Sequence, residues 1–200
     1  MKVGGSLFHM PQLRRRLISW LENLPSPCVF VAGGGHFVDE AMREAHVDLV
    51  GDQIANSHWK AIHAMSASAN WLADLMSPCP VVADFQELIE LGPHVRYCIW
   101  DVEKTLKEDG GRSLPVSDEA TSDSIAAWLA TYIGVKELTL LKSVGGETET
   151  IELAIAEKRG WVDRCFASLA ATLEVEWVNF RTGVACKLLQ AIRPDDRLLQ

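Results

Sequence analysis

Short apolar runs of strand length alternate along the chain with longer stretches in which apolar side chains recur at helical spacing. The runs that predict strands are residues 28–32, 80–85, 95–101, 136–142, 175–180 and 183–189. The stretches that predict helices are residues 10–23, 36–50, 52–76, 86–91, 121–134, 148–158 and 162–172. Residues 1–4 leave room for only a stub of a first strand, and residues 108–120 have the composition of a loop. Strands that alternate with helices favour an α/β fold, here a three-layer α/β/α sandwich with a mainly parallel central sheet.

Length and composition narrow the class of protein. The chain has 200 residues without an obvious linker or repeat, so we expect one domain spanning 1–200, and 48% apolar residues are enough for a core. A net charge of −8 argues against a nucleic-acid partner, because the phosphate backbone attracts basic surfaces. Five scattered cysteines suit a reducing compartment, which predicts a cytoplasmic protein. We expect no signal peptide and no membrane span, because no apolar run approaches the roughly 20 residues that a span needs.

Two glycine-rich turns are the first candidates for a ligand site. Lys2-Val3-Gly4-Gly5-Ser6 ends the first strand, where glycines let the backbone approach a ligand and a lysine adds positive charge. Gly33-Gly34-Gly35-His36 joins a buried strand to a helix, a position at which backbone N–H groups bind phosphate. An ordinary strand turn explains the first motif equally well, and His36 alone is typical of a capping or packing residue. Neither motif is a Walker loop or a dinucleotide-binding fingerprint.

Two later motifs place charged side chains at the ends of a helix and a strand. Thr121 or Ser122 can cap the helix that they open, and Asp123 then lies in the first turn, where the helix dipole favours its ionised form. The segment Leu140–Gly146 is a buried strand that ends in Lys142 and a glycine turn. Ligands gather at the carboxyl ends of strands in such folds. Taken alone, the first motif fits a plain helix cap and the second a solvated lysine.

Taken together, the four motifs resemble the amino acid kinase family in order and spacing, over nearly the whole chain. That family includes carbamate, acetylglutamate, aspartate, uridylate and isopentenyl phosphate kinases. The short length and the segments LPVSDEATSDSIAAWLA and LLKSVGG look closest to a small archaeal-type subgroup. This subgroup includes the kinase that phosphorylates an aminomethylfuranmethyl phosphate in methanofuran biosynthesis.

The resemblance implies an ATP-dependent phosphotransferase, in which Mg²⁺ bridges the ATP phosphates and no covalent intermediate forms. The catalytic residues that it implies are Lys2, Asp123 and Lys142, with Asp123 between the two lysines. The nucleotide-binding residues that it implies are Gly4, Gly5, Ser6, Ser122, Ser143, Val144 and Gly145. The acceptor-binding residues that it implies are Gly33, Gly34, Gly35 and His36. No side chain is assigned to a metal. Lys60 can also meet an anionic acceptor, although a solvated lysine is the more ordinary interpretation.

One departure from the family and two alternative functions stay open on the sequence alone. Many members have a late Gly-Gly-Met segment and a second phosphate-binding lysine. This chain lacks both, and Lys142 is the substitute that we favour over Lys187 and Arg181. The leading hypothesis is a kinase that phosphorylates a small phosphorylated acceptor. The alternatives are a carboxylate kinase that forms an acyl phosphate and a nucleotide- or oxyanion-binding protein without turnover. The apolar helix at 52–76 also predicts a homodimer.

Overall fold

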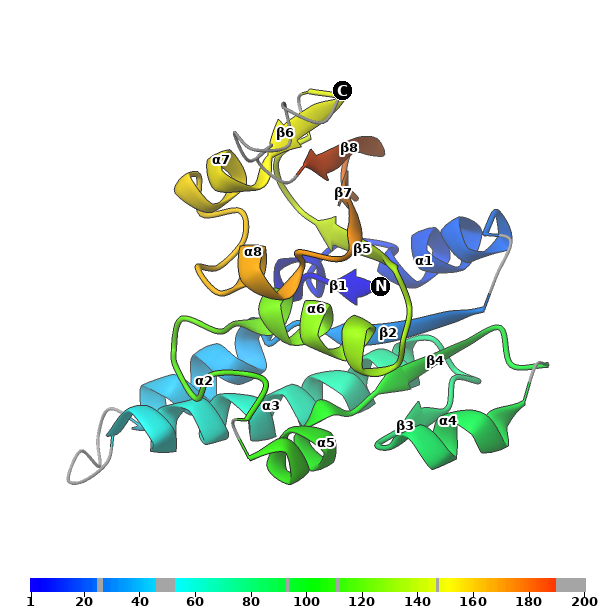
Figure 1. The fold of residues 1–200 in the computed structure, drawn as a ribbon. Helices are drawn as coiled ribbons and strands as arrows, with labels where there is room; N and C mark the ends of the chain where they lie inside the picture. Colours follow the sequence, from blue (N-terminus) through cyan, green and yellow to red (C-terminus); the bar gives the residue numbers. More distant parts are fainter. Residues whose placement is uncertain (25–26, 46–52, 93, 111, 147, 190–200) are drawn as a thin grey trace.

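The computed structural model describes residues 1–24, 27–45, 53–92, 94–110, 112–146 and 148–189. Within these ranges, eight strands form one sheet in the order β3-β4-β2-β1-β5-β7-β8-β6. The strands are β1 (Lys2–Val3), β2 (Cys28–Ala32), β3 (Val81–Val82), β4 (Tyr97–Trp100), β5 (Glu137–Lys142), β6 (Thr150–Glu152), β7 (Glu174–Asn179) and β8 (Val184–Leu189). In Figure 1 this order can be followed from β6 and β8 at the top to β4 and β3 at the bottom. Neighbouring strands pair in parallel, except for the antiparallel pair β7–β8.

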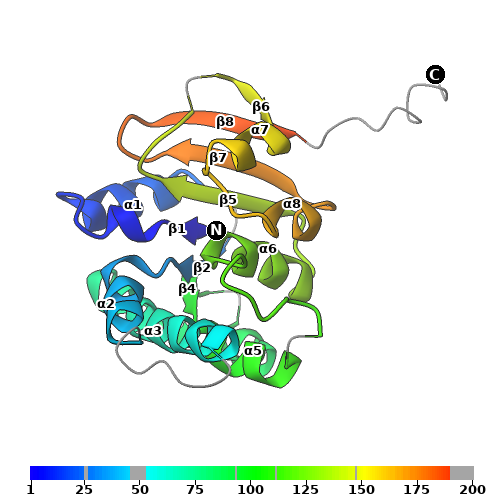
Figure 2. The same cartoon turned by 90° about the vertical axis from the view of Figure 1, so that its left-hand side faces the viewer.

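Helices cover both faces of this sheet. They are α1 (Leu13–Glu22), α2 (Gly35–Ala45), α3 (Gln53–Leu75), α4 (Phe85–Leu91), α5 (Val102–Asp109), α6 (Ser122–Tyr132), α7 (Leu153–Lys158) and α8 (Phe166–Leu169), together with a short 3₁₀ helix, η1 (Gly5–Leu7). Figure 2 shows the molecule after a quarter turn, with α1 on one side of β1 and α6 and α8 on the other. Among the described residues, no helix is both long and apolar enough to cross a membrane.

The side chains of the central strands alternate between two hydrophobic clusters, one on each face of the sheet. Leu140 packs in the cluster that contains Ile125 of α6, whereas its neighbour Leu141 packs in the cluster that contains Leu17 of α1. The long helix α3 contributes Ile62 to the first cluster and Leu72 to the second. The predicted three-layer α/β/α sandwich with a mainly parallel sheet is therefore confirmed.

Several predicted elements need correction. The helix expected at 148–158 is divided into strand β6 and helix α7, because residues 150–152 pair with 187–189 of β8. The helix expected at 162–172 is only the single turn α8. Helix α5 was not predicted; it begins where the carboxylate of Asp101 accepts a hydrogen bond from the backbone N–H of Glu103. Helix α2 ends at Ala45, and residues 46–52, at the end of the expected helix 36–50 and the start of the expected helix 52–76, lie outside the described residues.

The apolar side chains of α3 bear on the predicted homodimer. Met65, Leu72 and Met76, which follows α3, are buried inside the chain, and Trp71 packs on Phe8 with ring centroids 4.7 Å apart. The exposed positions in the described part of α3 include His63, which faces Glu103 of α5. The core thus accounts for these large apolar side chains, and the homodimer stays a prediction.

Candidate active site

Two lysines meet one aspartate at the carboxyl ends of the central strands. Lys2 Nζ lies 2.8 Å from Oδ1 of Asp123, and Lys142 Nζ donates a hydrogen bond of 2.6 Å to Oδ2 of the same carboxylate. Only 4% of Lys2 and 4% of Asp123 is exposed to solvent, so the cluster is buried. Asp123 thus lies between Lys2 and Lys142, and the catalytic roles of the three residues stay predictions.

The sheet and one helix end bring these three side chains together. Strand β1 pairs with β5 so that Val3 lies beside Leu141, and both of these side chains face α1. Because side chains alternate along a strand, Lys2 and Lys142 both face α6. Asp123 enters from the first turn of α6, whose N-cap is Thr121. Two adjacent parallel strands and a helix N-terminus thus converge on one point.

The charges in the cluster shift each other's protonation. Burial alone would raise the pKa of Asp123, but the charges of Lys2 and Lys142 outweigh it and hold that pKa below its ordinary value. Burial lowers the pKa of Lys142 from 10.5 to about 8, with the charge of Lys2 adding to the effect and Asp123 opposing it. The cluster therefore carries a surplus of positive charge in a site with little water, which suits an anionic ligand such as phosphate.

The two predicted glycine turns are packed against each other beside this cluster. A β-carbon on Gly5 would lie 2.1 Å from the backbone nitrogen of Gly35, and one on Gly33 would lie 2.6 Å from the nitrogen of Gly5. The N–H of Gly33 donates to the carbonyl of Val3 over 2.8 Å. No side chain fits between the turns, which explains why both contain glycine.

The predicted nucleotide-binding residues at the end of β5 lie next to the first glycine turn. The hydroxyls of Ser6 and Ser143 are 2.9 Å apart, and the N–H of Gly4 donates to Leu141 O over 2.8 Å. Val144 is exposed, and Gly145 has a φ of +78°, a conformation that favours glycine. The two predicted nucleotide-binding segments thus form one continuous surface.

Two functional candidates escaped the sequence analysis, and both lie in the segment 161–163. The carbonyl of Trp161 accepts a hydrogen bond of 3.0 Å from Lys142 Nζ, and the Trp161 ring stacks on Trp177 with centroids 5.0 Å apart. Lys142 Nζ also lies 5.0 Å from the centroid of the Trp177 ring. Asp163 accepts hydrogen bonds from Thr121 Oγ1 over 2.7 Å and from the backbone N–H of Thr121 over 3.0 Å.

Ser124 is held by the same carboxylate as Thr121, because the hydroxyl and the backbone N–H of Ser124 also donate hydrogen bonds to Asp163. The segment 161–163 therefore holds both Lys142 and the first turn of α6, which carries Asp123. No local pattern in the sequence marks the segment Gly160–Asp163 as functional.

A pocket of about 270 Å³ opens beside the cluster. Its lining residues are Gly34, Gly35, Val38, Asp39, Met42, His58, Ala61, Ile62, Met65, Ser117, Asp118, Ala120, Thr121, Ser122 and Ile125. Ser122, predicted to bind the nucleotide, therefore lines this pocket together with two of the predicted acceptor residues, Gly34 and Gly35.

The other three predicted acceptor residues do not line the pocket. Gly33 lies against Gly5 instead. His36 packs on Phe37 with ring centroids 4.1 Å apart, and its buried Nδ1 has no hydrogen-bond partner among the described residues. Lys60 is half-buried on α3 outside the lining. These three stay predictions without a contact to the pocket.

Comparisons with known proteins agree with this arrangement. Residues 1–146 match the model of the amino acid kinase family, which is more than half of the chain. The chain belongs to the amino acid kinase family. A comparison with curated proteins gave no match.

Two similar solved structures support the fold of this amino acid kinase family member. One is the uridylate kinase of Archaeoglobus fulgidus, with a TM-score of 0.64 and 14% identity over 94% of this chain and 97% of that chain. The other is the UMP kinase of Ureaplasma parvum, with a TM-score of 0.65 and 11% identity over 96% of this chain and 97% of that chain. The family and the fold together identify a phosphotransferase of the kinase type.

Proposed function

We propose that the protein transfers the γ-phosphoryl group of ATP to a small phosphorylated acceptor that carries an amine. Aminomethylfuranmethyl phosphate, in the cytoplasmic biosynthesis of methanofuran or a related C1 cofactor, is the acceptor that we favour. The observation that carries the proposal is a buried, positively charged cluster directly beside a small pocket whose charged lining residues are acidic. The cluster suits the phosphates and the pocket suits a cationic group.

The cationic end of the acceptor is matched by carboxylates. Asp39 and Asp118 line the pocket, and among its described lining residues neither lysine nor arginine occurs. Ser57 Oγ donates to Asp118 Oδ1 over 2.9 Å, which fixes the orientation of that carboxylate. An ammonium group bound between such carboxylates would form charge-assisted hydrogen bonds.

The anionic end of the acceptor is matched by the N-terminus of α2. Gly34 and Gly35 of the pocket lining stand there, whereas at α6 the backbone N–H groups of Thr121 and Ser124 already donate to Asp163. The N-terminus of a helix attracts phosphate through its free N–H groups and its dipole. A phosphate seated there would lie next to the charge cluster, which is where the acceptor oxygen must meet the γ-phosphorus.

Catalysis by this arrangement rests on positioning and on charge neutralisation. Lys2 and Lys142 would neutralise the charge that spreads over the transferring phosphoryl group, and Asp123 would hold both ammonium groups in place. The described residues contain no group of three His, Cys, Asp or Glu side chains that could form a metal cage. Mg²⁺ would therefore be held chiefly by the ATP phosphates, as it commonly is in kinases, and would supply further charge neutralisation.

An acceptor panel tests the proposal. Purified protein would be assayed for ADP release with Mg-ATP and four acceptors: aminomethylfuranmethyl phosphate, its analogue without the amine, UMP and glutamate. We expect the highest kcat/KM with the first compound. A preference for glutamate would support the carboxylate kinase, and ATP binding without ADP release with any acceptor would support a binding protein.

A pair of variants tests the role of the acidic pocket. Asp118→Asn should raise KM for the amine-bearing acceptor by about tenfold, the effect of losing one charge-assisted hydrogen bond, while kcat changes little. For the analogue without the amine, the same variant should have no such effect. Asp109→Asn, at the end of α5, is the matched control and should behave like the wild type. Equal effects of Asp118→Asn on both acceptors would contradict the proposed ammonium contact.

A further inference from the structure

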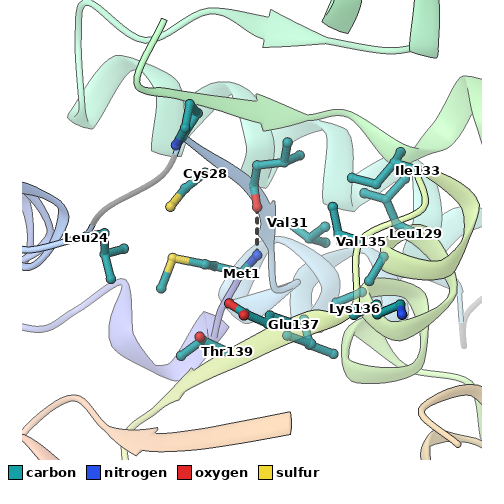
Figure 3. Close-up of a pocket in the computed structure, with 15 residues that line it drawn as sticks. Met1, Leu24, Cys28, Val31, Leu129, Ile133, Val135, Lys136, Glu137 and Thr139 are labelled. Carbon is teal, nitrogen blue, oxygen red and sulfur yellow. Dashed lines mark hydrogen bonds between the residues drawn. The ribbon is translucent and has the colours of Figure 1, made fainter. Parts of the chain in front are cut away.

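Two pockets in the described part of the chain differ in chemical character. Figure 3 shows the larger one, of about 410 Å³, around Met1 and Leu24; its described lining is mainly apolar and contains no histidine. The pocket of about 270 Å³ beside the charge cluster also has apolar walls, but His58 of α3 lines it as well. Only 5% of His58 is exposed, so this smaller pocket contains a buried nitrogen base that the proposed chemistry has not yet used.

One hydrogen bond determines which ring nitrogen of His58 carries the proton. Nδ1 lies 3.1 Å from the carbonyl oxygen of Ser117, in the loop before α6. A carbonyl oxygen can only accept a hydrogen bond, so Nδ1 is the donor and carries the hydrogen. In the neutral imidazole, Nε2 then carries the lone pair. His58 therefore offers a hydrogen-bond acceptor at Nε2.

The second ring nitrogen of His58 opens to the pocket. Among the described residues, Nε2 has no hydrogen-bond partner, and the fully buried side-chain nitrogens without a partner are those of Trp20 and His36. Nε2 therefore keeps some accessible surface, and in a side chain that is almost fully buried and lines the pocket, that surface belongs to the pocket wall. The Trp59 ring packs edge-on against the imidazole, with centroids 5.2 Å apart and planes at 84°, which helps to fix the direction of Nε2.

We propose that Nε2 of His58 is the third hydrogen-bond partner of the substrate ammonium group and makes the pocket selective for a primary amine. This inference rests on the proposed function, in which the phosphoryl acceptor carries an amine. A primary alkylammonium group has three N–H donors that point in three directions. Asp39 of α2, His58 of α3 and Asp118 of the loop before α6 line the pocket and supply one partner each, from three different elements. Every methyl group added to the nitrogen removes one donor.

The carboxylates and the imidazole contribute differently to selectivity. Asp39 and Asp118 are exposed residues of the lining, so water and salt weaken their attraction for a cation. His58 is buried, and a buried hydrogen-bonding group that loses its partner costs more than an exposed one. The carboxylates therefore attract any cation, whereas Nε2 distinguishes a cation that donates a hydrogen bond from one that does not.

His58 also has a structural effect, which the test has to separate from the contact to substrate. Its Nδ1 bond holds Ser117, and Ser57 of the same helix turn donates to Asp118 Oδ1 over 2.9 Å. Both bonds fix the loop that carries Asp118. Asparagine places an N–H near the position of Nδ1 but has no atom at the position of Nε2, whereas glutamine reaches the position of Nε2 but not that of Nδ1. These two substitutions therefore divide the functions of the ring.

Steady-state assays with two phosphoryl acceptors test the proposal. They are aminomethylfuranmethyl phosphate and its N,N,N-trimethyl derivative, which keeps the positive charge but donates no hydrogen bond. For the primary amine, His58→Asn should raise KM by about tenfold or more with little change in kcat, and His58→Gln should keep KM within about threefold of the wild type. For the trimethyl derivative, neither variant should change KM.

A histidine on the same helix provides the matched control. His63 lies five residues further along α3, with 78% of its side chain exposed, and His63→Asn should behave like the wild type with both compounds. The reverse order of the two variants at position 58, with KM raised by His58→Gln and not by His58→Asn, would assign His58 to holding the loop and overturn the proposal.

Nitrogen NMR tests the same contact in the wild-type protein without catalysis. In protein with ¹⁵N-labelled histidine, the signals of His58, assigned by their absence from His58→Asn, should show a protonated Nδ1 and an unprotonated Nε2. Aminomethylfuranmethyl phosphate, added without ATP, should move the Nε2 signal toward the protonated range, and the trimethyl derivative should not. A hydrogen on Nε2 in place of Nδ1, or an Nε2 signal that responds equally to both compounds, would overturn the proposal.

The two experiments also separate this inference from the proposed function. An Nε2 signal that responds to the primary amine, together with no ADP release from Mg-ATP and that compound, would support the amine contact and contradict the proposed phosphoryl transfer. ADP release with the primary amine, together with an unchanged KM in His58→Asn, would support the transfer and contradict the role of His58.

Discussion

The carboxylate of Asp163 accepts a hydrogen bond of 2.7 Å from the hydroxyl of Thr121, a residue 42 positions earlier in the chain. This contact and those to Ser124 fix the helix turn from which Asp123 reaches the two lysines. Asp163 itself touches neither lysine in any described contact. Its effect on the reaction would therefore pass through the position of Asp123, which makes it a positioning residue.

Replacing Asp163 should damage turnover more than nucleotide binding. Asp163→Asn keeps the shape of the side chain but weakens its acceptor oxygens, so the first turn of α6 should shift and kcat should fall by up to about 10²-fold. KM for ATP should change by less than about threefold. Asp84→Asn, which weakens the cap of α4 and its ion pair with Lys104, is the control for a loss of stability alone. If Asp163→Asn, like Asp84→Asn, lowered only the free energy of unfolding and left kcat unchanged, a positioning role for Asp163 would be excluded.

Activity should decline as the pH rises through about 8. In the proposed mechanism, phosphoryl transfer needs the charged form of Lys142, and burial lowers the pKa of this lysine to about 8. Above that pH, kcat/KM for ATP should fall by about tenfold per pH unit. The ATP phosphates favour the charged lysine, so the decline in kcat should begin at a higher pH than the decline in kcat/KM.

Folding stability should change with pH in the opposite direction to activity, so it serves as the control for that pH profile. The folded-state pKa of Lys142 lies below its ordinary value of 10.5, so unfolded chains bind more protons between about pH 8 and 10.5. The contribution of this lysine to stability therefore rises with pH across that window. A loss of activity that coincided with unfolding in circular dichroism would contradict the assignment to Lys142.

Substitutions in the charge cluster should separate turnover from binding. Asp123→Asn should lower kcat by about 10²–10³-fold, the usual effect of removing one preorganised group, with a smaller effect on ATP affinity. It also removes the carboxylate that raises the pKa of Lys142, so the alkaline decline should move to lower pH. Lys2→Ala should lower both kcat and ATP affinity, because its charge acts on bound ATP as well as on the transition state.

A comparison of two lysine variants tests whether Lys142 or Lys187 supplies the second catalytic charge. Lys142→Ala should abolish most turnover, whereas Lys187→Ala, at an exposed position of β8, should not. The reverse result in a steady-state assay would show that Lys187 supplies the charge.

The contact between the glycine turns predicts a strong asymmetry between two glycine substitutions. Gly5→Ala would place a β-carbon 2.1 Å from the backbone of Gly35, and backbone atoms cannot move aside cheaply. Gly134→Ala has open space but a φ of +76°, which costs about 1 kcal/mol in an L-residue. We expect Gly5→Ala to lower the free energy of unfolding by about 3 kcal/mol, more than Gly134→Ala does. Equal shifts in denaturant midpoint would contradict the close packing of the turns.

The sequence predicted those parts of the site that depend on local signals. Lys2 and Lys142 stand in strands shortly before glycine turns, and Asp123 stands in the first turn of a capped helix, so each has a recognisable position in the chain. Strand β2 was predicted at its observed bounds because five consecutive apolar residues are flanked by Pro27 and glycines.

The parts that depend on distant contacts could not be found in this way. Asp163 lies in a turn with no pattern of its own, and its importance comes from donors 39 and 42 residues away. The sequence of β6 predicts a helix, because only the pairing with β8 fixes its extended conformation. The pocket beside the charge cluster is lined by residues of α2, α3, α6 and the loop before α6, and no local spacing in the sequence predicts that these residues lie together.

The stack of Trp161 on Trp177 has an optical consequence. Lys142 lies over the Trp177 ring and is bonded to the Trp161 carbonyl, so the charge of this lysine acts directly on two coupled indoles. Indole emission responds to nearby charge, and a triphosphate that draws the Lys142 ammonium away would change the emission of this pair. We therefore expect the fluorescence of this pair to report nucleotide binding, an effect that Trp161→Phe should weaken even in an acceptor-free titration.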